Sequence, residues 1–372
     1  MINTDRLIKI FLELVQIDSP SGYEKDVVDY ILRYLETIGV ESTLDTYGNV
    51  IATVAGDSKL EPVLLTAHLD TVEPGKGIKP EVKNIAGIDT IVSAGDTILG
   101  ADNKAGVACI LETLTAILEE SLPHPSLEIV FTLSEEIANL GATNLDYTLL
   151  KARIGFSFDG SGAVGTITTA SPFYNRFDIE IVGKASHAGK PELGINALNI
   201  LGKGLQNINL GRISQNTLCN IGQVIGGSTR NTVPGTITVM GEVRSYLENE
   251  LTHETNKIIL AFEEAAQQLG GTINHEIVRE NPGFRLAADD ELVKLGMEAV
   301  QNLQIPQVLQ ETTGCYDANI FFDHKIRVLN FSNGSKSNHT VNECIAVGDL
   351  VNTANIAYEL ATNLNLYRFV LN

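Results

Sequence analysis

Five short segments of this chain of 372 residues are rich in metal-binding side chains and lie where the surrounding pattern predicts strand ends. Zinc and hard divalent cations bind imidazole nitrogens and carboxylate oxygens, and a two-metal hydrolase takes such ligands from several elements of its fold. The combination therefore indicates a hydrolytic metal site. The segments are His68-Leu69-Asp70, Asp102 with its neighbours, Glu135-Glu136, Asp159 and His339-Thr340.

His68 and Asp70 are two residues apart at the end of a predicted strand, so their side chains point to the same face of the sheet. His68 can bind a metal through one ring nitrogen. Asp70 can accept a hydrogen bond from the other nitrogen or orient the ligand cluster, as carboxylates beside metal-bound histidines commonly do. Taken alone, a histidine and an aspartate at this spacing more often mark a strand end that binds no metal.

Asp102 lies between Gly100 and a predicted helix. Its two oxygens can bridge two cations about 3.5–4 Å apart, although an aspartate here can also simply cap the helix. Glu135 and Glu136 follow an apolar strand, and adjacent carboxylates in a loop diverge. One of them can therefore bind a metal while the other takes a proton from water, and the alternative is a capping box with solvated glutamates.

The stretch from Gly160 to Gly165 matches GxGxxG, the pattern of a dinucleotide-binding loop. Such a loop must open a helix, whose N-terminus binds the pyrophosphate. The residues that follow, 166–169, are β-branched and predict a strand instead. The sequence also contains no GxxxxGKS or GxxxxGKT motif. We therefore exclude nucleotide binding.

Apolar runs alternate with helical periodicity over residues 1–172 and return over 281–372, which predicts an α/β domain built from two parts of the chain. The runs 62–68 and 127–133 are almost continuously apolar, as in strands buried on both faces of a parallel sheet. In such sheets the active site lies beyond the carboxyl ends of the strands. The candidate ligands follow runs of this kind, so we expect the metal site at this edge.

Residues 173–280 have a different pattern. The run 176–182 alternates polar and apolar residues with a period of two, which predicts a strand with one exposed face. Further patterns give the order strand, helix, strand, strand, helix, strand, which describes a small α+β sandwich with one open sheet face. We therefore predict a second domain inserted into the first.

The composition argues against several classes of function. A net charge of −20 argues against nucleic acid as a partner, because its phosphates would be repelled. The amphipathic N-terminal segment lacks the uninterrupted apolar core of a secretory signal, and no run of about 18 apolar residues could span a membrane. The four cysteines are scattered without a CxxC pair, as free thiols in a reducing compartment would be. We therefore expect a cytoplasmic protein that binds neither nucleic acid nor membranes.

The order and setting of these motifs resemble the M20 family of dinuclear zinc peptidases, nearest its peptidase T-like (tripeptide aminopeptidase) branch. The resemblance covers essentially the whole chain. Each motif alone is weak, but their order around an inserted α+β domain is specific. The matching segments are His68-Leu69-Asp70-Thr71-Val72, Leu99-Gly100-Ala101-Asp102-Asn103-Lys104-Ala105-Gly106, Ser134-Glu135-Glu136, Phe158-Asp159-Gly160, Ser186-His187-Ala188-Gly189 and His339-Thr340.

The resemblance implies a zinc-peptidase catalytic domain with a mixed, mostly parallel sheet, and an inserted ferredoxin-like α+β domain that serves as lid and dimerisation domain. It also implies two Zn²⁺ ions per subunit, with Co²⁺ or Mn²⁺ as alternatives. His68 and Asp159 would hold one ion. Glu136 and His339 would hold the other, and Asp102 would bridge the two.

The same resemblance assigns three catalytic residues. Asp70 would support His68. Glu135 would act as the general base on a water activated by the metals. His187 would stabilise the oxyanion, in dimers of the family often from the neighbouring subunit.

Three further residues match positions that contact substrate in the family. Asn231 and Arg244, in the inserted domain, resemble the pair that grips the substrate near its carboxylate. Gly314 resembles a glycine that contacts substrate through its backbone. The sequence departs from the branch here, because residues 312–319 stand where a Gly-Gly-Thr-Asp-Gly-like stretch is expected. This departure concerns tripeptide specificity rather than hydrolysis.

These features lead us to expect a homodimeric aminopeptidase that removes the N-terminal residue from short peptides such as di- and tripeptides. In the family, aspartate at the position of Asp159 accompanies aminopeptidases, whereas glutamate accompanies carboxypeptidases and deacylases. Two alternatives stay open. One is an M20-type amidohydrolase that deacylates N-acyl amino acids, and the other is a metal-free scaffold that binds peptides.

Overall fold

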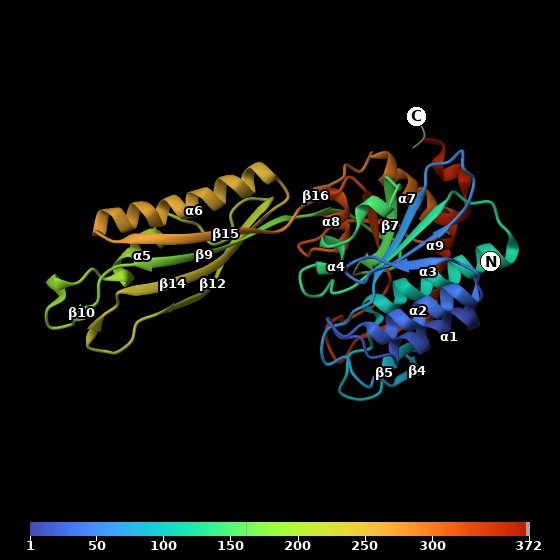
Figure 1. The fold of residues 1–372 in the computed structure, drawn as a ribbon, viewed down its shortest axis with the longest axis horizontal. Helices are drawn as coiled ribbons and strands as arrows, with labels where there is room; N and C mark the ends of the chain where they lie inside the picture. Colours follow the sequence, from blue (N-terminus) through green and yellow to red (C-terminus); the bar gives the residue numbers. More distant parts are fainter. Residues whose placement is uncertain (161, 370–372) are drawn as a thin grey trace. The chain divides into compact units, whose positions relative to one another are not determined.

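The computed structural model describes residues 1–160 and 162–369. The chain divides into two compact units. One is formed by Met1–Ala170 together with Leu286–Asn372, and the other by Ser171–Arg285. Figure 1 follows both units along the chain, and each is described by itself below.

The sequence placed the inserted domain at residues 173–280, a range that lies within the second unit. A strand of the first unit, β8 (Thr166–Ser171), leads to this unit, which begins at the last residue of the strand. β8 follows the glycine-rich stretch, at the position where the β-branched residues predicted a strand rather than a nucleotide-binding helix. Ser161 of that stretch and residues 370–372 lie outside the described residues.

The first unit is built on a mixed, mostly parallel sheet, as the sequence predicted. Its strands follow the order β1-β2-β6-β3-β7-β18-β8, and β17 pairs with β8. The pairs β6–β3, β3–β7 and β7–β18 are parallel. The pairs β1–β2, β2–β6 and β18–β8 are antiparallel. The strands besides β8 are β1 (Ser42–Leu44), β2 (Val50–Val54), β3 (Val63–His68), β6 (Leu127–Thr132), β7 (Ile154–Gly160), β17 (Val308–Glu311) and β18 (Arg327–Ser332).

Helix α3 (Ala101–Glu120) is central to this unit. It packs against β3 and β7, and also against α1 and α9. All of its residues from Ala101 to Ile117 are buried except Asp102, as in a helix surrounded by other elements. The other helices are α1 (Thr4–Val15), α2 (Lys25–Thr37), α4 (Leu140–Thr143), α7 (Glu291–Asn302), α8 (Asp317–Asp323) and α9 (Val347–Thr362), with 3₁₀ segments at Tyr147–Leu149 and Leu364–Phe369.

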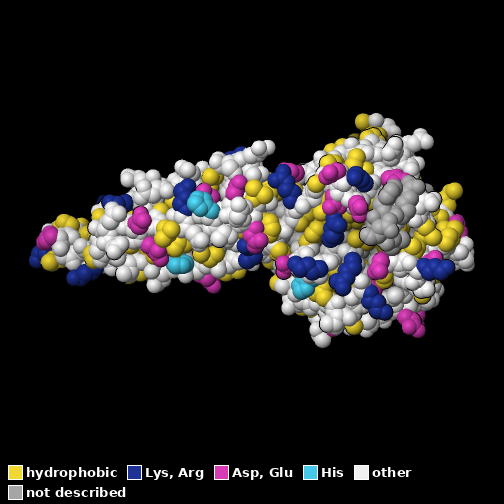
Figure 2. All heavy atoms as spheres, turned by 90° about the horizontal axis from the view of Figure 1, so that it is seen from above, with side chains coloured by type: hydrophobic (Ala, Val, Ile, Leu, Met, Phe, Trp, Pro, Cys, Tyr) yellow, Lys and Arg dark blue, Asp and Glu magenta, His cyan; other side chains and the backbone are white. Residues whose placement is uncertain are grey.

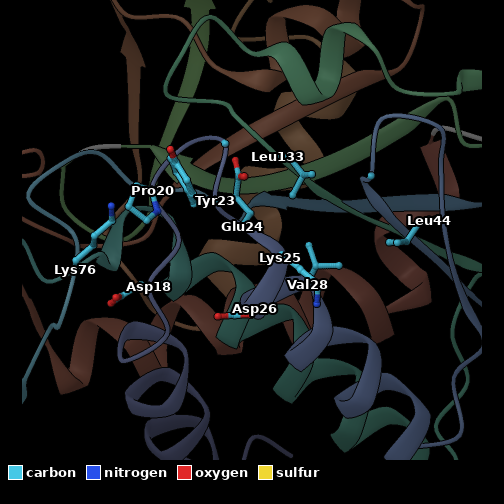
Figure 3. A pocket seen from close by; sticks show the side chains of 12 residues that line it. Asp18, Pro20, Tyr23, Glu24, Lys25, Asp26, Val28, Leu44, Lys76 and Leu133 are labelled. Atoms are coloured by element: carbon cyan, nitrogen blue, oxygen red, sulfur yellow. The ribbon is translucent and has the colours of Figure 1, made fainter.

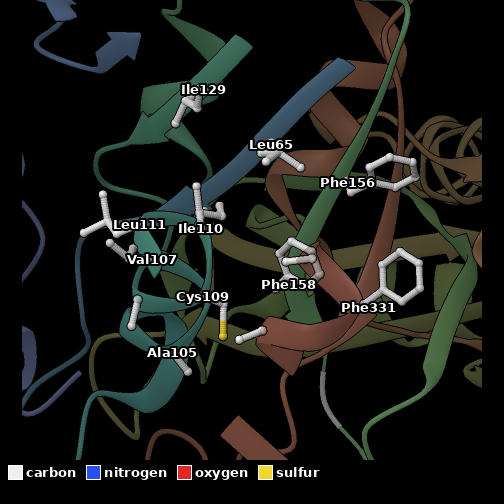
Figure 4. Packing of buried hydrophobic residues seen from close by; sticks show 14 of the residues in the cluster. Leu65, Ala105, Val107, Cys109, Ile110, Leu111, Ile129, Phe156, Phe158 and Phe331 are labelled. Atoms are coloured by element: carbon white, nitrogen blue, oxygen red, sulfur yellow. The ribbon is translucent and has the colours of Figure 1, made fainter. Parts of the chain in front are cut away.

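The hydrophobic core fixes α3 against the sheet. Figure 4 shows Ile110 of α3 with Leu65 of β3 and Phe158 of β7, all members of one buried cluster. Burial of each such side chain contributes about 1.5–3 kcal/mol to stability. Because α3 is held against both strands in this way, its first turn is fixed relative to their carboxyl ends.

Several shorter elements were not predicted. A small sheet pairs β4 (Pro80–Ile85) and β5 (Ile88–Ser93) with β19 (Cys344–Ala346). β4 has no buried residue, so its sequence lacks the apolar alternation by which a strand can be recognised. Helices α7 and α8 and strand β17 were also missed.

The second unit has the predicted order of strand, helix, strand, strand, helix and strand. Its sheet follows the order β11-β12-β14-β9-β15 with antiparallel pairs, and its four long strands have the ferredoxin-like arrangement. Phe177, Ile179 and Ile181 of β9 are fully buried, as the period-two pattern predicted. The elements are β9 (Phe173–Val182), β10 (Ser186–His187), α5 (Ala197–Leu205), β11 (Gly211–Arg212), β12 (Thr217–Gly226), β13 (Thr232–Val233), β14 (Thr236–Ser245), α6 (Glu248–Leu269), β15 (Thr272–Asn281) and β16 (Phe284–Arg285), with a 3₁₀ turn at Pro191–Leu193.

The face drawn in Figure 2 carries mixed charge. On the face shown in Figure 2, lysine and arginine side chains are interspersed with aspartate and glutamate rather than gathered in one patch. Among the described residues, no helix is both long and apolar enough to cross a membrane.

Candidate metal centre

The predicted metal ligands lie at the carboxyl edge of the parallel strands. His68 is the last residue of β3, and Asp159 is the next to last residue of β7. Glu136 follows β6, and His339 lies in the loop between β18 and β19. Asp102 is in the first turn of α3, where its backbone is not helical. The structure thus brings residues from five parts of the sequence to one edge of the sheet, where α/β folds place their sites.

Two groups of three ligand atoms share Asp102. In each group the ligand atoms all lie within 4.8 Å of one another. His68 Nε2 lies 3.2 Å from Asp102 Oδ1 and 3.4 Å from Asp159 Oδ1. His339 Nε2 lies 2.9 Å from Glu136 Oε1 and 3.5 Å from Asp102 Oδ2. The two oxygens of Asp102 therefore face different histidines, as a carboxylate that bridges two cations must.

The carboxylates at this edge perturb one another and the histidines. Burial alone would lower the pKa of His68, but the carboxylates of Asp159 and Asp102 raise it well above its ordinary value. Burial and the adjacent Asp102 also raise the pKa of Asp159. Hydrogen bonds with Asp102 and Glu136 raise the pKa of His339 to about 10. Divalent cations would relieve this crowding of negative charge, so both the donor types and the electrostatics fit a pair of such ions.

Asp70 contacts two parts of the candidate site. Its carboxylate lies 3.3 Å from His68 Nδ1, which leaves His68 Nε2 facing Asp102. The backbone N–H groups of Glu135 and Glu136 donate to its two oxygens at 2.9 and 3.1 Å. The sequence suggested the contact between Asp70 and His68, but not the hydrogen bonds from the backbone of Glu135 and Glu136 to Asp70.

His187 and the three residues predicted to contact substrate are distributed over both units. In the second unit, His187 is exposed on β10, and the residue after it donates its N–H to the Asn231 carbonyl at 2.8 Å. Arg244 instead lies on β14, where it forms an ion pair with Glu242 at 3.1 Å. Gly314 lies in the first unit, in the loop before α8. The structure therefore places the segment that carries His187 beside the segment that carries Asn231, and it places Arg244 on the main sheet of the same unit.

A pocket of about 590 Å³ lies beside the start of α2 (Figure 3). Tyr23, Glu24 and Leu133 are among its lining residues, which include none of the five predicted ligands. The carboxylate of Glu24 accepts hydrogen bonds from the backbone N–H and the hydroxyl of Ser134, at 3.1 and 3.0 Å. The pocket therefore borders Glu24, which holds the residue before Glu135, rather than the cluster of predicted metal ligands.

Comparison with known proteins agrees with this geometry. Residues 64–363 match the profile of Peptidase family M20/M25/M40. The chain belongs to this family. The resemblance to M20 peptidases that the motifs indicated is thereby confirmed, and the chain is an enzyme of a metal-dependent peptidase family.

Three relatives of this M20 chain extend along nearly its whole length. The uncharacterized protein YqjE of Bacillus subtilis (strain 168) is 36% identical over 363 residues, which cover 95% of this chain and 97% of YqjE. The crystal structure of aminopeptidase PepT from Bacillus cereus is 34% identical with a TM-score of 0.93, covering 98% of this chain and 99% of that one. A tripeptidase structure from Staphylococcus aureus is 32% identical with a TM-score of 0.92 and the same coverage.

Sequence reasoning missed two residues that connect segments of the candidate metal centre. Glu343 is buried, and its carboxylate accepts hydrogen bonds from the backbone N–H groups of Leu99, Gly100 and Asp102 at 2.9, 2.7 and 3.0 Å. The side-chain amide of Asn338 donates to Asp102 Oδ2 at 3.0 Å. Both residues flank His339 in sequence, so they connect its loop to the turn that carries Asp102. Their nearness to His339 was the only signal in the sequence, because their partners are more than 200 residues away.

We predict that Glu343→Gln destabilises this M20 enzyme by about 1–3 kcal/mol, because an amide NH₂ would face backbone donors that now share two carboxylate oxygens. Urea unfolding of the purified protein measures the change. Glu41→Gln, at an exposed position, serves as the control and should lie within about 0.5 kcal/mol of the unchanged protein. Equal stability of the two variants would contradict the role assigned to Glu343.

Proposed function

We propose that this M20 enzyme hydrolyses peptide bonds in short peptides and releases the N-terminal residue of di- and tripeptides. The observation that carries the proposal is the Asp102 carboxylate, whose two oxygens face two separate histidines. Each histidine has a further carboxylate beside it. Such an arrangement can hold two divalent cations with one shared ligand, as two-metal hydrolases require.

The proposed ions are two Zn²⁺ per subunit, and Co²⁺ or Mn²⁺ can occupy the same ligands. His68 and Asp159 would hold one ion, and Glu136 and His339 the other. Asp102 would bind both. When bound, the ions would supply Lewis acidity toward a peptide carbonyl and toward water.

Glu135 would act as the general base. It forms a group with His68 and Glu136 whose ligand atoms lie within 4.8 Å of one another, so it stands beside the proposed ligands without being needed among them. From this position its carboxylate would take a proton from the attacking water and pass it to the leaving amine nitrogen. Asp70 would keep it in place by holding its backbone N–H.

His187 would stabilise the oxyanion of the tetrahedral intermediate. The N–H of Gly189 donates to His187 Nδ1 at 3.0 Å, so a neutral ring carries its proton on Nε2. The Nε2–H group is then a hydrogen-bond donor. One such donor lowers the barrier of an acyl transfer by about 3–4 kcal/mol in other enzymes.

Two relatives support the proposal that the enzyme releases the N-terminal residue. The Bacillus cereus structure is described as an aminopeptidase PepT and the Staphylococcus aureus structure as a tripeptidase. Both match this chain over 98% of its length. Asn231, Arg244 and Gly314 are proposed to contact the peptide. Residues 312–319 depart from the pattern of the peptidase T-like branch, so we propose that the peptide preference of this enzyme differs from that of the branch there.

We also propose a homodimer formed through the second unit. Strand β12 lies next to an edge strand, β11, that is only two residues long. Val224 and Ile225, near the end of β12, are 49% and 58% exposed. Unpaired apolar strand edges are commonly covered by another chain, and twofold symmetry lets the same edge serve both copies.

Two substitutions separate proton transfer from metal binding. Glu135→Ala should lower kcat by about 10²–10⁴-fold while the metal content measured by inductively coupled plasma mass spectrometry stays near two per chain. Asp102→Ala should release the metals, because both would lose their shared ligand. Asp89→Ala, at an exposed position, is the control for both measurements. Loss of metal from Glu135→Ala would reverse the roles given to Glu135 and Glu136, and full occupancy in Asp102→Ala would refute the bridge.

Substrate chemistry can be tested with matched peptides. The proposal predicts rapid release of the first residue from a tripeptide with a free amine, and no cleavage of its N-acetylated form. Liquid chromatography coupled to mass spectrometry identifies the released products and so distinguishes the two reactions. Preferential removal of the acetyl group would instead assign the enzyme to N-acyl amino acid deacylation.

Complementation tests whether His187 acts across the dimer. Glu135→Ala and His187→Ala should each be inactive as pure dimers. After random exchange of subunits between equal amounts of the two variants, half of the dimers are mixed. Each mixed dimer has one site that combines an intact Glu135 from one chain with an intact His187 from the other. The mixture should therefore recover about a quarter of the unsubstituted activity. A fully active monomer, or no recovery in dimers shown to be mixed, would mean that His187 does not act from the partner.

A further inference from the structure

The side chain of Asn139 connects Glu135 to the buried carboxylate of Asp317. Asn139 Nδ2 donates to Glu135 Oε1 at 3.0 Å and to Asp317 Oδ1 at 3.1 Å. One amide group thus uses both of its protons on two different carboxylates. Of the donors in the described part of the chain, it is the one that reaches the Glu135 carboxylate.

The backbone around Asn139 is shaped for this contact. Asn139 has a φ of +53°, in the left-handed region that asparagine adopts more readily than most residues. Its N–H donates to the Glu135 carbonyl at 2.8 Å, and the N–H of Leu140 donates to the Ser134 carbonyl at 3.0 Å. The loop therefore folds back so that the Asn139 side chain lies beside the Glu135 side chain.

Asp317 gives this amide a rigid anchor. It is the first residue of α8 and is buried, with a relative exposure of 4%. Its second oxygen accepts a hydrogen bond from the hydroxyl of Thr132, the last residue of β6. Each oxygen of Asp317 thus binds one donor, and the anchor is tied to the central sheet. Asn139 is also buried, with a relative exposure of 5%.

We propose that Asn139, anchored by Asp317, is a positioning residue for Glu135. The amide holds Oε1 of Glu135, which leaves Oε2 to receive the proton in the reaction. Rigid placement matters because a displacement of about 1 Å in a reacting group can cost about 10²-fold in rate. This inference rests on the role of Glu135 in the proposed function, but the position of its side chain can be measured without any substrate.

The test is the substitution Asn139→Gly, because glycine accepts the left-handed backbone while the side chain that carries the amide is removed. We expect kcat on a tripeptide to fall about 10²-fold, with KM and zinc content unchanged. We also expect a crystal structure of the variant to show the Glu135 carboxylate displaced or in several conformations. The matched control is Asn144→Gly in the same segment, where the lost amide donates to the Leu140 carbonyl instead, and kcat should not change.

Two substitutions of the anchor sharpen the test. In Asp317→Asn an oxygen can still accept from Asn139 while the Thr132 hydroxyl turns to accept from the new amide, so kcat should stay within about threefold. Asp317→Ala removes the anchor and should lower kcat as much as Asn139→Gly. The double variant Asn139→Gly, Asp317→Ala should be no slower than either single variant, because both break the same chain of contacts.

The outcomes separate this inference from the proposed function. If Asn139→Gly keeps kcat within about threefold and Glu135 in place, the positioning role is wrong even though the enzyme cleaves peptides. If the unsubstituted enzyme cleaves no peptide but Glu135 moves in Asn139→Gly, the proposed substrate is wrong and the positioning role stands. If kcat falls while Glu135 keeps its position, Asn139 acts in some other way and the inference is overturned.

Discussion

The site depends on holding like charges close together. Asp102, Asp159, Glu135 and Glu136 bring four carboxylates to one edge of the central sheet, beside two imidazoles. At a separation of about 4 Å and an effective dielectric constant of about 20, two such charges repel by about 4 kcal/mol. Stability alone would disfavour this grouping. Two divalent cations would reverse the sign of the interaction, so the first unit would act as a frame that resists the repulsion until such cations bind.

The frame combines hydrophobic packing with buried hydrogen bonds. The buried helix α3 fixes the turn that carries Asp102, and the core beneath it fixes β3 and β7. Asp70 accepts from two backbone N–H groups and Glu343 from three, so these carboxylates hold loops rather than single side chains. A loop held in this way can present a ligand with little freedom of its own, which favours tight binding of a metal.

The α/β class and the gathering of the candidate ligands at one edge of the sheet could be predicted from the sequence, because both follow from local patterns. An apolar run that ends in His68 or Asp159 indicates a buried strand and a site at its end. The supports could not be predicted in the same way. Glu343 binds a turn that is more than 240 residues away, and Asn139 meets Asp317 only after β6 and α8 have packed together. The exposed strand β4 was missed because exposure removes the pattern itself.

The most direct test of this account is an anomalous difference map at the zinc absorption edge, measured on crystals of the protein prepared without chelator and supplied with zinc. The account predicts two peaks. One should lie between His68 and Asp159 and the other between Glu136 and His339, with Asp102 in contact with both. A single peak, or peaks that do not contact Asp102, would contradict the claim that its carboxylate bridges two metal ions.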